Sequence, residues 1–182
     1  MKKLFSIAPL LLFACCSASF ASQEPMVGGS KMYPSKNIVE NAVNSADHTT
    51  LVAAVKAAGL VETLESPGPF TVFAPTNEAF QKLPAGTVDT LLKPENKAML
   101  VKVLTYHVLP GRFSAAKLKK QVEASGGTAM LKTVNGETLT FTMDGDSLVV
   151  KDAKGNTAHI TIPNVYQSNG VIHVIDTVLM PN

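Results

Sequence analysis

The sequence predicts an α+β fold in which helices come first and an antiparallel β region follows. In the first half of the chain apolar residues recur every three or four positions, which is typical of amphipathic helices. In the second half they alternate with polar residues, and turn signals such as Asn135-Gly136 separate the runs, as in β-hairpins. One early strand stands apart and must pair at long range. This order argues against repeated β-α-β units.

The composition predicts one neutral, well-packed domain. The chain has 182 residues, of which 46% are hydrophobic, enough for a single core. Without Lys2 and Lys3, 14 of the 16 basic residues remain and balance the 14 acidic ones. The one basic cluster, Arg112 with residues 117–120, has helical spacing and is interpreted as a solvated helix face. We therefore expect no nucleic-acid partner.

Residues 1–21 have the pattern of a signal peptide. Lys2 and Lys3 precede an apolar run, and small residues end the segment at "SASFA". The apolar run is shorter than the roughly 20 residues that a membrane-spanning helix needs. We expect export to the periplasm or the extracellular space, a mature chain that begins near Ser22, and no transmembrane anchor in that mature chain.

Cys15 and Cys16 both lie in this segment, so a chain cleaved after Ala21 has no thiol and no disulfide. An alternative remains, because "LFAC" resembles a bacterial lipoprotein box. In that case Cys15 is lipidated and becomes the N-terminus. Phe13 departs from the small residue usual at its position, which favours ordinary cleavage.

Residues 22–36 mix Gly, Pro, Ser and charged residues without periodicity, and we expect a flexible lead-in. The domain then covers residues 37–182. Its first two helices are expected within residues 37–46 and 48–59, with Gly59 as the C-terminal cap of the second.

Residues 70–75, "FTVFAP", predict a short buried strand, because β-branched and aromatic residues lie between prolines. Thr76 or Asn77 is expected to cap the short helix that follows. Two more helices are expected, within residues 86–92 and from Pro94, whose ring suits a first helical position.

Residues 106–111, "YHVLPG", are expected to be extended, and "SAAKLKK" predicts a short helix. In an extended segment the adjacent side chains of Tyr106 and His107 diverge. His107 precedes the bend-prone pair Pro110-Gly111, so we expect it to be partly exposed, which makes it the first candidate for a functional histidine.

The last strand carries His173 and Asp176, which at first suggest a catalytic or metal-binding pair. Six of the eight residues in "VIHVIDTV" are β-branched, which favours a strand. Residues three apart in a strand face opposite sides, so the two cannot form a local dyad. Both faces are apolar, which predicts a central strand with hydrogen-bonded structural polar residues.

No motif predicts catalysis, a metal or a cofactor. The sequence has no G-x-S-x-G elbow, no glycine pattern for nucleotides and no pair of histidines with zinc-ligand spacing. Asp144 and Asp146 begin like a calcium loop but lack its later ligands, and a hairpin turn is the better interpretation. A hydrolase site assembled from distant residues stays a third hypothesis.

Three stretches together resemble the fasciclin-like domain family. They are "FTVFAPTNEAF" (70–80), "YHVL" (106–109) and "NGVIHVIDTVLMP" (169–181), in the family's order, within a likeness that runs from about Asn37 to Pro181. The resemblance implies an α+β fold: a β-wedge of two small sheets packed by several α-helices. Within it we assign His173, Asp176 and Asn77 to a structural polar core.

The resemblance also implies a non-enzymatic, extracytoplasmic adhesion or protein-interaction module. In animal members the Tyr-His element is linked to integrin adhesion, which makes Tyr106, His107, Val108 and Leu109 candidate binding residues here. The expected partner is an extracytoplasmic protein, a surface glycan or a matrix component. The alternative is a periplasmic small-molecule-binding protein that uses a cleft near His107, with convergent polar groups around it.

Overall fold

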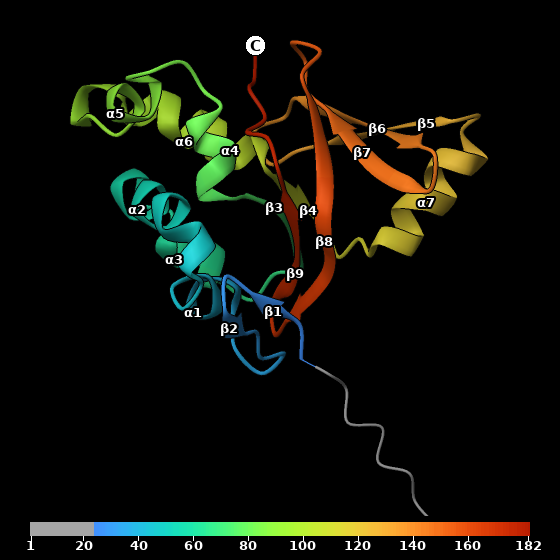
Figure 1. Cartoon of the computed structure of the whole chain (residues 1–182), viewed down its shortest axis with the longest axis horizontal. Helices are drawn as coiled ribbons and strands as arrows, with labels where there is room; N and C mark the ends of the chain where they lie inside the picture. Colours follow the sequence, from blue (N-terminus) through green and yellow to red (C-terminus); the bar gives the residue numbers. More distant parts are fainter. Residues whose placement is uncertain (1–23) are drawn as a thin grey trace, which may run out of the picture.

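The computed structural model describes residues 24–182 and shows a bent β-sheet with helices on two sides (Figure 1). The helices α1 to α6 pack on one half of the sheet, and α7 packs on the other. Within the described residues no helix is long and apolar enough to cross a membrane. The helical elements are α1 (Ile38–Ala42), η1 (Ala46–His48), α2 (Thr49–Ala58), α3 (Val61–Glu65), α4 (Asn77–Gln81), α5 (Thr87–Leu91), η2 (Pro94–Asn96), α6 (Lys97–Tyr106) and α7 (Ala115–Ala124).

Seven strands form one hydrogen-bonded sheet in the order β4-β3-β9-β8-β7-β6-β5, and two more form a separate hairpin. The early strand β3 pairs in parallel with the last strand β9, so that Phe70 lies beside Gly170. All other neighbours in the sheet are antiparallel. The strands are β1 (Met26–Val27), β2 (Ser30–Lys31), β3 (Phe70–Pro75), β4 (Val108–Pro110), β5 (Thr128–Lys132), β6 (Thr138–Asp144), β7 (Ser147–Lys151), β8 (Thr157–Gln167) and β9 (Gly170–Ile175).

The prediction of a central, doubly covered last strand is confirmed. All six residues of β9 are buried, and the strand lies between β3 and β8. Because side chains alternate along a strand, β9 contributes to two cores. Ile172 and Val174 pack in the core under the helices, whereas Ile175 packs with Phe73 and Phe141 in the core between the two halves of the sheet.

The long strand β8 joins the two halves of the expected wedge. Its first residues pair with β7 and its later residues pair with β9, with register shifts after Ile160 and Ile162. Asn164, in the second irregular stretch, has a φ of 60°, the left-handed conformation that asparagine tolerates better than most residues. The bend turns the β7, β6 and β5 strands away from the plane of β3 and β9.

The expectation of a flexible lead-in over residues 22–36 is wrong for its described part. Residues 26–31 form the β1–β2 hairpin, and Val27 and Met32 are buried in the core under the helices. The Gly- and Pro-rich composition provides the turn, with Gly28 and Gly29 both at positive φ. The predicted signal peptide and Cys15 lie outside the described residues.

The helix boundaries follow the expected capping residues. Gly59 adopts the left-handed conformation at the end of α2, with a φ of 73°. Thr76, rather than Asn77, caps α4, and its side chain accepts a hydrogen bond from the amide of Ala79. Pro94 begins a 3-10 turn that leads into α6.

One expectation about local structure is wrong, and one helix is missing from the prediction. Residues 106–111 are not extended throughout, because α6 includes Tyr106, His107 caps it, and the strand β4 begins only at Val108. The helix α3 is also absent from the prediction, since five residues are too few to show a clear periodicity.

The turn between β8 and β9 anchors the helices to the sheet. Asn169 accepts a hydrogen bond from the amide of Ile38, at 3.1 Å, and donates to the carbonyls of Leu64 and Ser66. It thereby joins α1 and the end of α3 to the start of β9. The next residue, Gly170, lies so close to the Phe70 carbonyl that a Cβ atom there would collide with it.

We expect Asn169→Ala to lower the free energy of unfolding by roughly 1–3 kcal/mol, because it leaves the buried amide of Ile38 without a partner. Urea unfolding followed by circular dichroism measures the change. Ser168→Ala, in the same turn but exposed, is the matched control and should unfold like the wild type. Equal stability of the two variants would contradict the anchoring role of Asn169.

Candidate functional site

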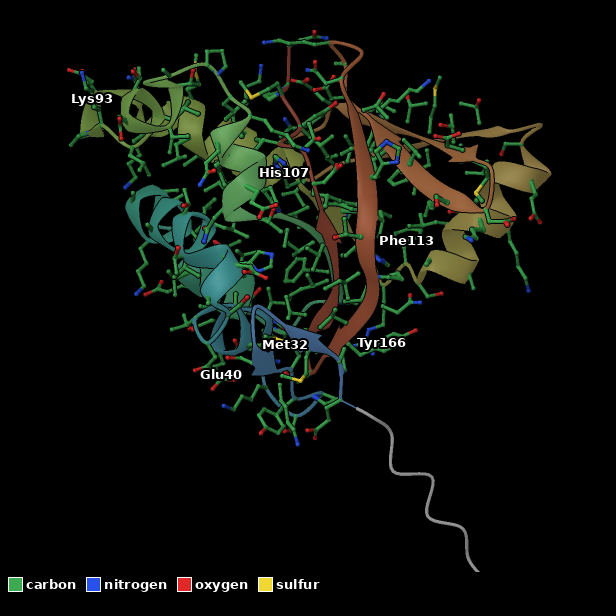
Figure 2. The ribbon with its side chains drawn as sticks, in the orientation of Figure 1. Met32, Glu40, Lys93, His107, Phe113 and Tyr166 are labelled. Carbon is green, nitrogen blue, oxygen red and sulfur yellow. The ribbon has the colours of Figure 1, made fainter. Side chains whose placement is uncertain are left out.

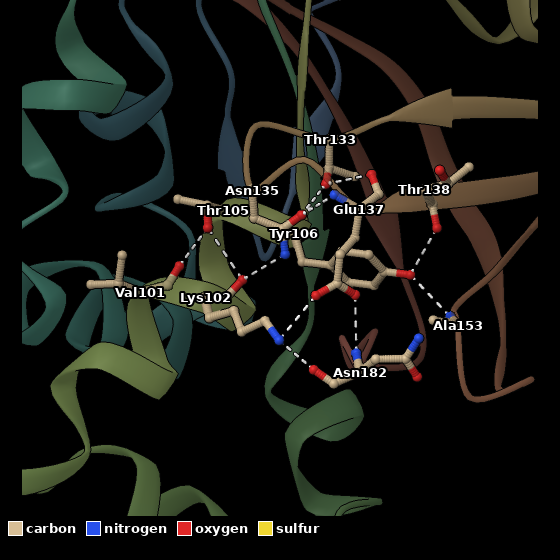
Figure 3. Close-up of polar contacts among 10 residues, drawn as sticks. All are labelled: Val101, Lys102, Thr105, Tyr106, Thr133, Asn135, Glu137, Thr138, Ala153 and Asn182. Carbon is tan, nitrogen blue, oxygen red and sulfur yellow. Dashed lines mark hydrogen bonds and ion pairs between the residues drawn. The ribbon is translucent and has the colours of Figure 1, made fainter.

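The first candidate residue, Tyr106, fastens three elements together inside the domain. Its side chain is fully buried, and its hydroxyl donates to the carbonyl of Thr138 and accepts from the amide of Ala153, both at 3.0 Å (Figure 3). Burial raises the pKa of this hydroxyl, while the Ala153 amide acts in the opposite direction. The residue therefore ties the end of α6 to β6 and to the turn between β7 and β8.

His107 is buried as well, so the expectation of partial exposure is wrong: only 3% of the residue is accessible. Figure 2 shows it where the helical side meets the sheet. Its Nδ1 lies 2.8 Å from the carbonyl oxygen of Val103, and its Nε2 accepts from the amide of Leu179 at 3.0 Å. These partners select the neutral ring protonated on Nδ1. Burial lowers the pKa of His107 to about 4, although the Val103 carbonyl favours the charged form.

The other two candidate binding residues lie in β4 and are also buried. Val108 packs in the core under the helices, and Leu109 packs in the core between the sheet halves. The structure thus brings Tyr106, His107, Val108 and Leu109 together as interior residues. Their role in binding stays a prediction, and nothing in their geometry presents them to a partner at the surface.

Beside His107, two carboxylates hold the end of the chain. The amide of Met180 donates to Asp152 Oδ2 at 2.9 Å, and the amide of Asn182 donates to Glu137 Oε2 at 3.0 Å. Lys102 contacts the carbonyl of Asn182 and lies 3.0 Å from Glu137 Oε1 (Figure 3). The hydrogen bond from Asn182 and then the one from Lys102 lower the pKa of Glu137. Together with His107, these three side chains form what we call the C-terminal clamp.

Sequence reasoning missed Asp152, Glu137 and Lys102. Asp152 had a detectable signal, since an aspartate that opens "DAKGN" suits a turn in which its side chain accepts backbone amides. It does so with the amides of Lys154 and Asn156 and is buried in the process. Its contact with residue 180 depends on tertiary structure and has no sequence signal.

His173 lies in β9, on the face of the sheet opposite to His107, and is fully buried. Its Nε2 lies 2.8 Å from the carbonyl oxygen of Phe113, its Nδ1 accepts from the amide of Asn164 at 3.3 Å, and its ring stacks on Phe73 with centroids 5.6 Å apart. Burial lowers the pKa of His173, with the Phe113 carbonyl opposing. Both ring nitrogens are engaged, so the geometry suits a neutral structural histidine.

Asp176 and Asn77 are less buried than a core assignment requires, and that part of the expectation is corrected. The side chain of Asp176 is 32% exposed, accepts from the amide of His159 at 2.9 Å and lies 3.5 Å from Lys82. Partial burial raises its pKa, but these polar contacts outweigh that effect and leave the value lowered. No hydrogen bond joins His173 to Asp176 among the described residues.

Asn77 joins two helices at the surface rather than in the core. Its Oδ1 accepts from the amide of Thr50 at 3.0 Å and from the Thr49 hydroxyl, and its Nδ2 donates to the carbonyl of Ala46. It therefore positions the start of α2 against α4.

A cavity of about 80 Å³ lies between α1, α2 and α3 on one side and β3, β4 and β9 on the other. His107 belongs to its wall, so a hollow exists where the cleft was expected. The expectation of convergent polar groups is wrong, however, because the accessible wall is apolar. Among residues 24–182 no three potential metal ligands lie close together.

The fold and the site together define a compact α+β domain in which the buried side chains of His107 and His173 form hydrogen bonds with backbone groups of the same domain. A model of the fasciclin domain matches residues 46–181, and the chain belongs to that family. Protein sll1483 of Synechocystis sp. is 55% identical over 79% of this chain and 73% of its own length. Immunogenic protein MPT70 of Mycobacterium tuberculosis is 39% identical over 90% of this chain and 79% of its own.

Two further similarities are to a cell surface glycolipoprotein and to a cell adhesion molecule. Cell surface glycolipoprotein MPT83 of Mycobacterium tuberculosis is 37% identical over 90% of this chain and 70% of its own length. The FAS1 domain pair of the insect cell adhesion molecule fasciclin I superimposes with a TM-score of 0.71 at 20% identity, over 81% of this chain and 51% of that one. The latter likeness establishes the shared fold.

Because His107 and His173 are buried, we expect the domain to lose stability in mild acid. Because the folded-state pKa of His107 is about 4 and the ordinary value is 6.5, the unfolded chain takes up its proton first as the pH falls. We expect His107 to remove about 3 kcal/mol of unfolding free energy between pH 6.5 and 4, and His173 to act in the same direction.

Urea unfolding at pH 7, 5 and 4 tests this expectation. His107→Gln keeps a donor and an acceptor but does not titrate, so its stability should change less over this range than that of the wild type. His159→Gln replaces an exposed histidine and is the matched control. Parallel pH profiles for the wild type and His107→Gln would show that His107 is not the group responsible.

Proposed function

We propose that this domain is an exported, non-enzymatic adhesion or protein-interaction module that binds a component of the cell envelope. Membership of the fasciclin family supports the proposal, as do relatives named for the cell surface and for cell adhesion. The internal use of both ring nitrogens of His107 and His173 also supports a non-enzymatic role.

One surface carries the proposal, and we call it the tyrosine patch: Tyr33, Lys36, Arg112 and Tyr166. The ammonium of Lys36 lies 5.2 Å from the centre of the Tyr33 ring. The two tyrosines are 38% and 44% exposed. Tyrosine and arginine are enriched in protein interfaces because they combine a rigid or planar contact area with hydrogen-bonding groups.

The turn between β8 and β9 brings these residues to one end of the molecule. The Ser168 amide donates to the Lys36 carbonyl at 2.9 Å, and Arg112 donates to the carbonyls of Gln167 and Ser168. Figure 2 shows Tyr166 at the end of β8 that lies next to the β1–β2 hairpin. Neither tyrosine side chain takes part in these contacts, so substitution of Tyr33 and Tyr166 leaves them in place.

Binding of the purified mature domain to isolated cell envelopes tests the proposal. We expect saturable binding that the double variant Tyr33→Ala/Tyr166→Ala weakens about tenfold or more, the size of effect that loss of interface tyrosines produces. Met99→Ala/Met130→Ala removes two exposed apolar side chains elsewhere and should bind like the wild type. No saturable binding, or equal loss in both double variants, would refute the role of the patch.

Export has its own test. Cleavage after Ala21 predicts that the intact mass of the mature protein corresponds to a chain beginning at Ser22. A mass that begins at Cys15 and includes lipid would replace this prediction with the lipoprotein alternative. In both outcomes the domain is exported; a mass that includes Met1 to Ala21 would contradict export.

A second candidate function is binding of a small molecule. One observation favours it, namely the apolar cavity that lies beside His107. This function does not need the tyrosine patch, so the two candidates can be tested separately.

A further inference from the structure

Both cation–π pairs found within residues 24–182 lie in or beside the tyrosine patch. The ammonium of Lys36 lies 5.2 Å from the centre of the Tyr33 ring, and that of Lys117 lies 4.4 Å from the centre of the Phe113 ring. Figure 2 shows Phe113 and Tyr166 beside the same strand, β8. In each pair the electron-rich face of the ring holds a cation that stays accessible to solvent.

Tyr166 lies between these two pairs along β8. On one side of it, the Ser168 amide donates to the carbonyl of Lys36 at 2.9 Å. On the other side, Asn164 Oδ1 accepts at 2.8 Å from the amide of Ala115, the first residue of α7. The tyrosine patch therefore continues past Tyr166 toward the start of α7.

The cations of this surface have no acidic partner in the part of the chain that the structure describes. No ion pair there includes Lys36, Arg112 or Lys117. Arg112 donates through Nη2 to two backbone carbonyls around the end of β8, which fixes the guanidinium in place. Glu40, the carboxylate nearest to Lys36 in the sequence, accepts from the amide of Asn37 instead. Three cations along one surface without a counterion favour an anionic partner.

We propose that this surface binds an acidic polysaccharide, a chain of sugar rings that carry carboxylates. Guanidinium and ammonium groups bind carboxylates through charge-assisted hydrogen bonds. The aromatic rings offer flat apolar faces against which the C–H faces of sugar rings pack. The inference rests on the proposed envelope-binding function and names the class of its partner.

The position of the surface favours an extended polymer over a folded protein. Protein interfaces concentrate their binding energy in side chains that fill well-packed pockets. The residues of the tyrosine patch, together with Phe113 and Lys117, line neither the apolar cavity nor the two other hollows of the domain. A partner therefore lies across exposed rings and cations without entering any of these hollows, which suits a chain with repeated acidic groups.

Calorimetry of the purified mature domain with polygalacturonate as the probe tests the proposal. We expect saturable binding that weakens as the salt concentration rises, because salt screens exposed charges. Methyl-esterified polygalacturonate has the same sugar backbone without the negative charges. It should bind at least tenfold more weakly.

Two kinds of variant examine the cations and the rings separately. Lys36→Gln/Lys117→Gln should weaken polygalacturonate binding about fivefold, the combined effect of two exposed ion pairs. Lys56→Gln/Lys97→Gln removes the same charge from exposed lysines of α2 and α6 and is the matched control. Tyr166→Leu keeps an apolar side chain but removes the flat ring, and should also weaken binding about fivefold. The melting temperatures should stay unchanged, since all five side chains are exposed.

Absence of saturable binding, or equal binding of the esterified polymer, would overturn the proposal. Equal weakening by the two lysine double variants would overturn the placement of the site. Equal affinity for polyglutamate or double-stranded DNA would show binding to any polyanion and would overturn the assignment to a sugar polymer.

The failure of this proposal is distinguishable from failure of the proposed function, because the measurements use no envelope material. If envelopes bind through the tyrosine patch, polygalacturonate does not, and protease treatment of the envelopes abolishes binding, the partner is a protein and only the polysaccharide is overturned. Binding of polygalacturonate without binding to envelopes would refute the proposed function and support the ligand class.

Discussion

The parallel pairing of β3 with β9 brings Phe70 beside Gly170 and Pro75 beside Ile175 in the middle of the sheet. Parallel neighbours need a long crossover connection and are covered on both faces. The helices α1 to α3, which precede β3, provide part of this cover, and the residues between the two strands provide the rest. They supply α4 to α6 on one face, and α7 with three hairpin strands on the other. Both cores, and hence every candidate site, depend on this one pairing.

Such a pairing closes a long loop, which costs chain entropy, so both ends of β9 need firm attachment. At its start, Asn169 fastens the strand to α1 and α3. Beyond its end, the C-terminal clamp fixes residues 179–182 through His107, Asp152 and Glu137. The Tyr-His element therefore has a clear structural task at the point where the last segment of the chain joins the helices.

The sequence predicted the parts of the fold that have local signals. These include the α+β class, the cap at Gly59, the strand over residues 70–75 and the central position of the last strand. It could not show which strands pair in parallel, nor that His107 is buried, because both depend on contacts between distant residues. The short hairpin at residues 26–31 was not predicted for another reason. Glycine, proline and serine are common both in turns and in flexible segments, so composition does not distinguish the two.

The three stretches that carry the family likeness are used mainly to hold the fold. The exposed residues of the tyrosine patch, such as Arg112 and Tyr166, lie outside those stretches. The shared fold can therefore serve different ligands in different relatives. The β1–β2 hairpin and the residues after it also connect the two candidate surfaces. Met32 belongs to the cavity wall, whereas the next residue, Tyr33, belongs to the tyrosine patch.

A change in this hairpin consequently affects both surfaces at once and does not separate the two functions. Lys56 and Tyr166 do separate them. Lys56 lies on α2 beside the cavity, and Tyr166 lies on β8 outside the cavity wall. Because both side chains are exposed, their replacement removes no core packing. The physical distinction between an envelope-binding domain and a small-molecule-binding domain therefore rests on residues that the fold itself does not require.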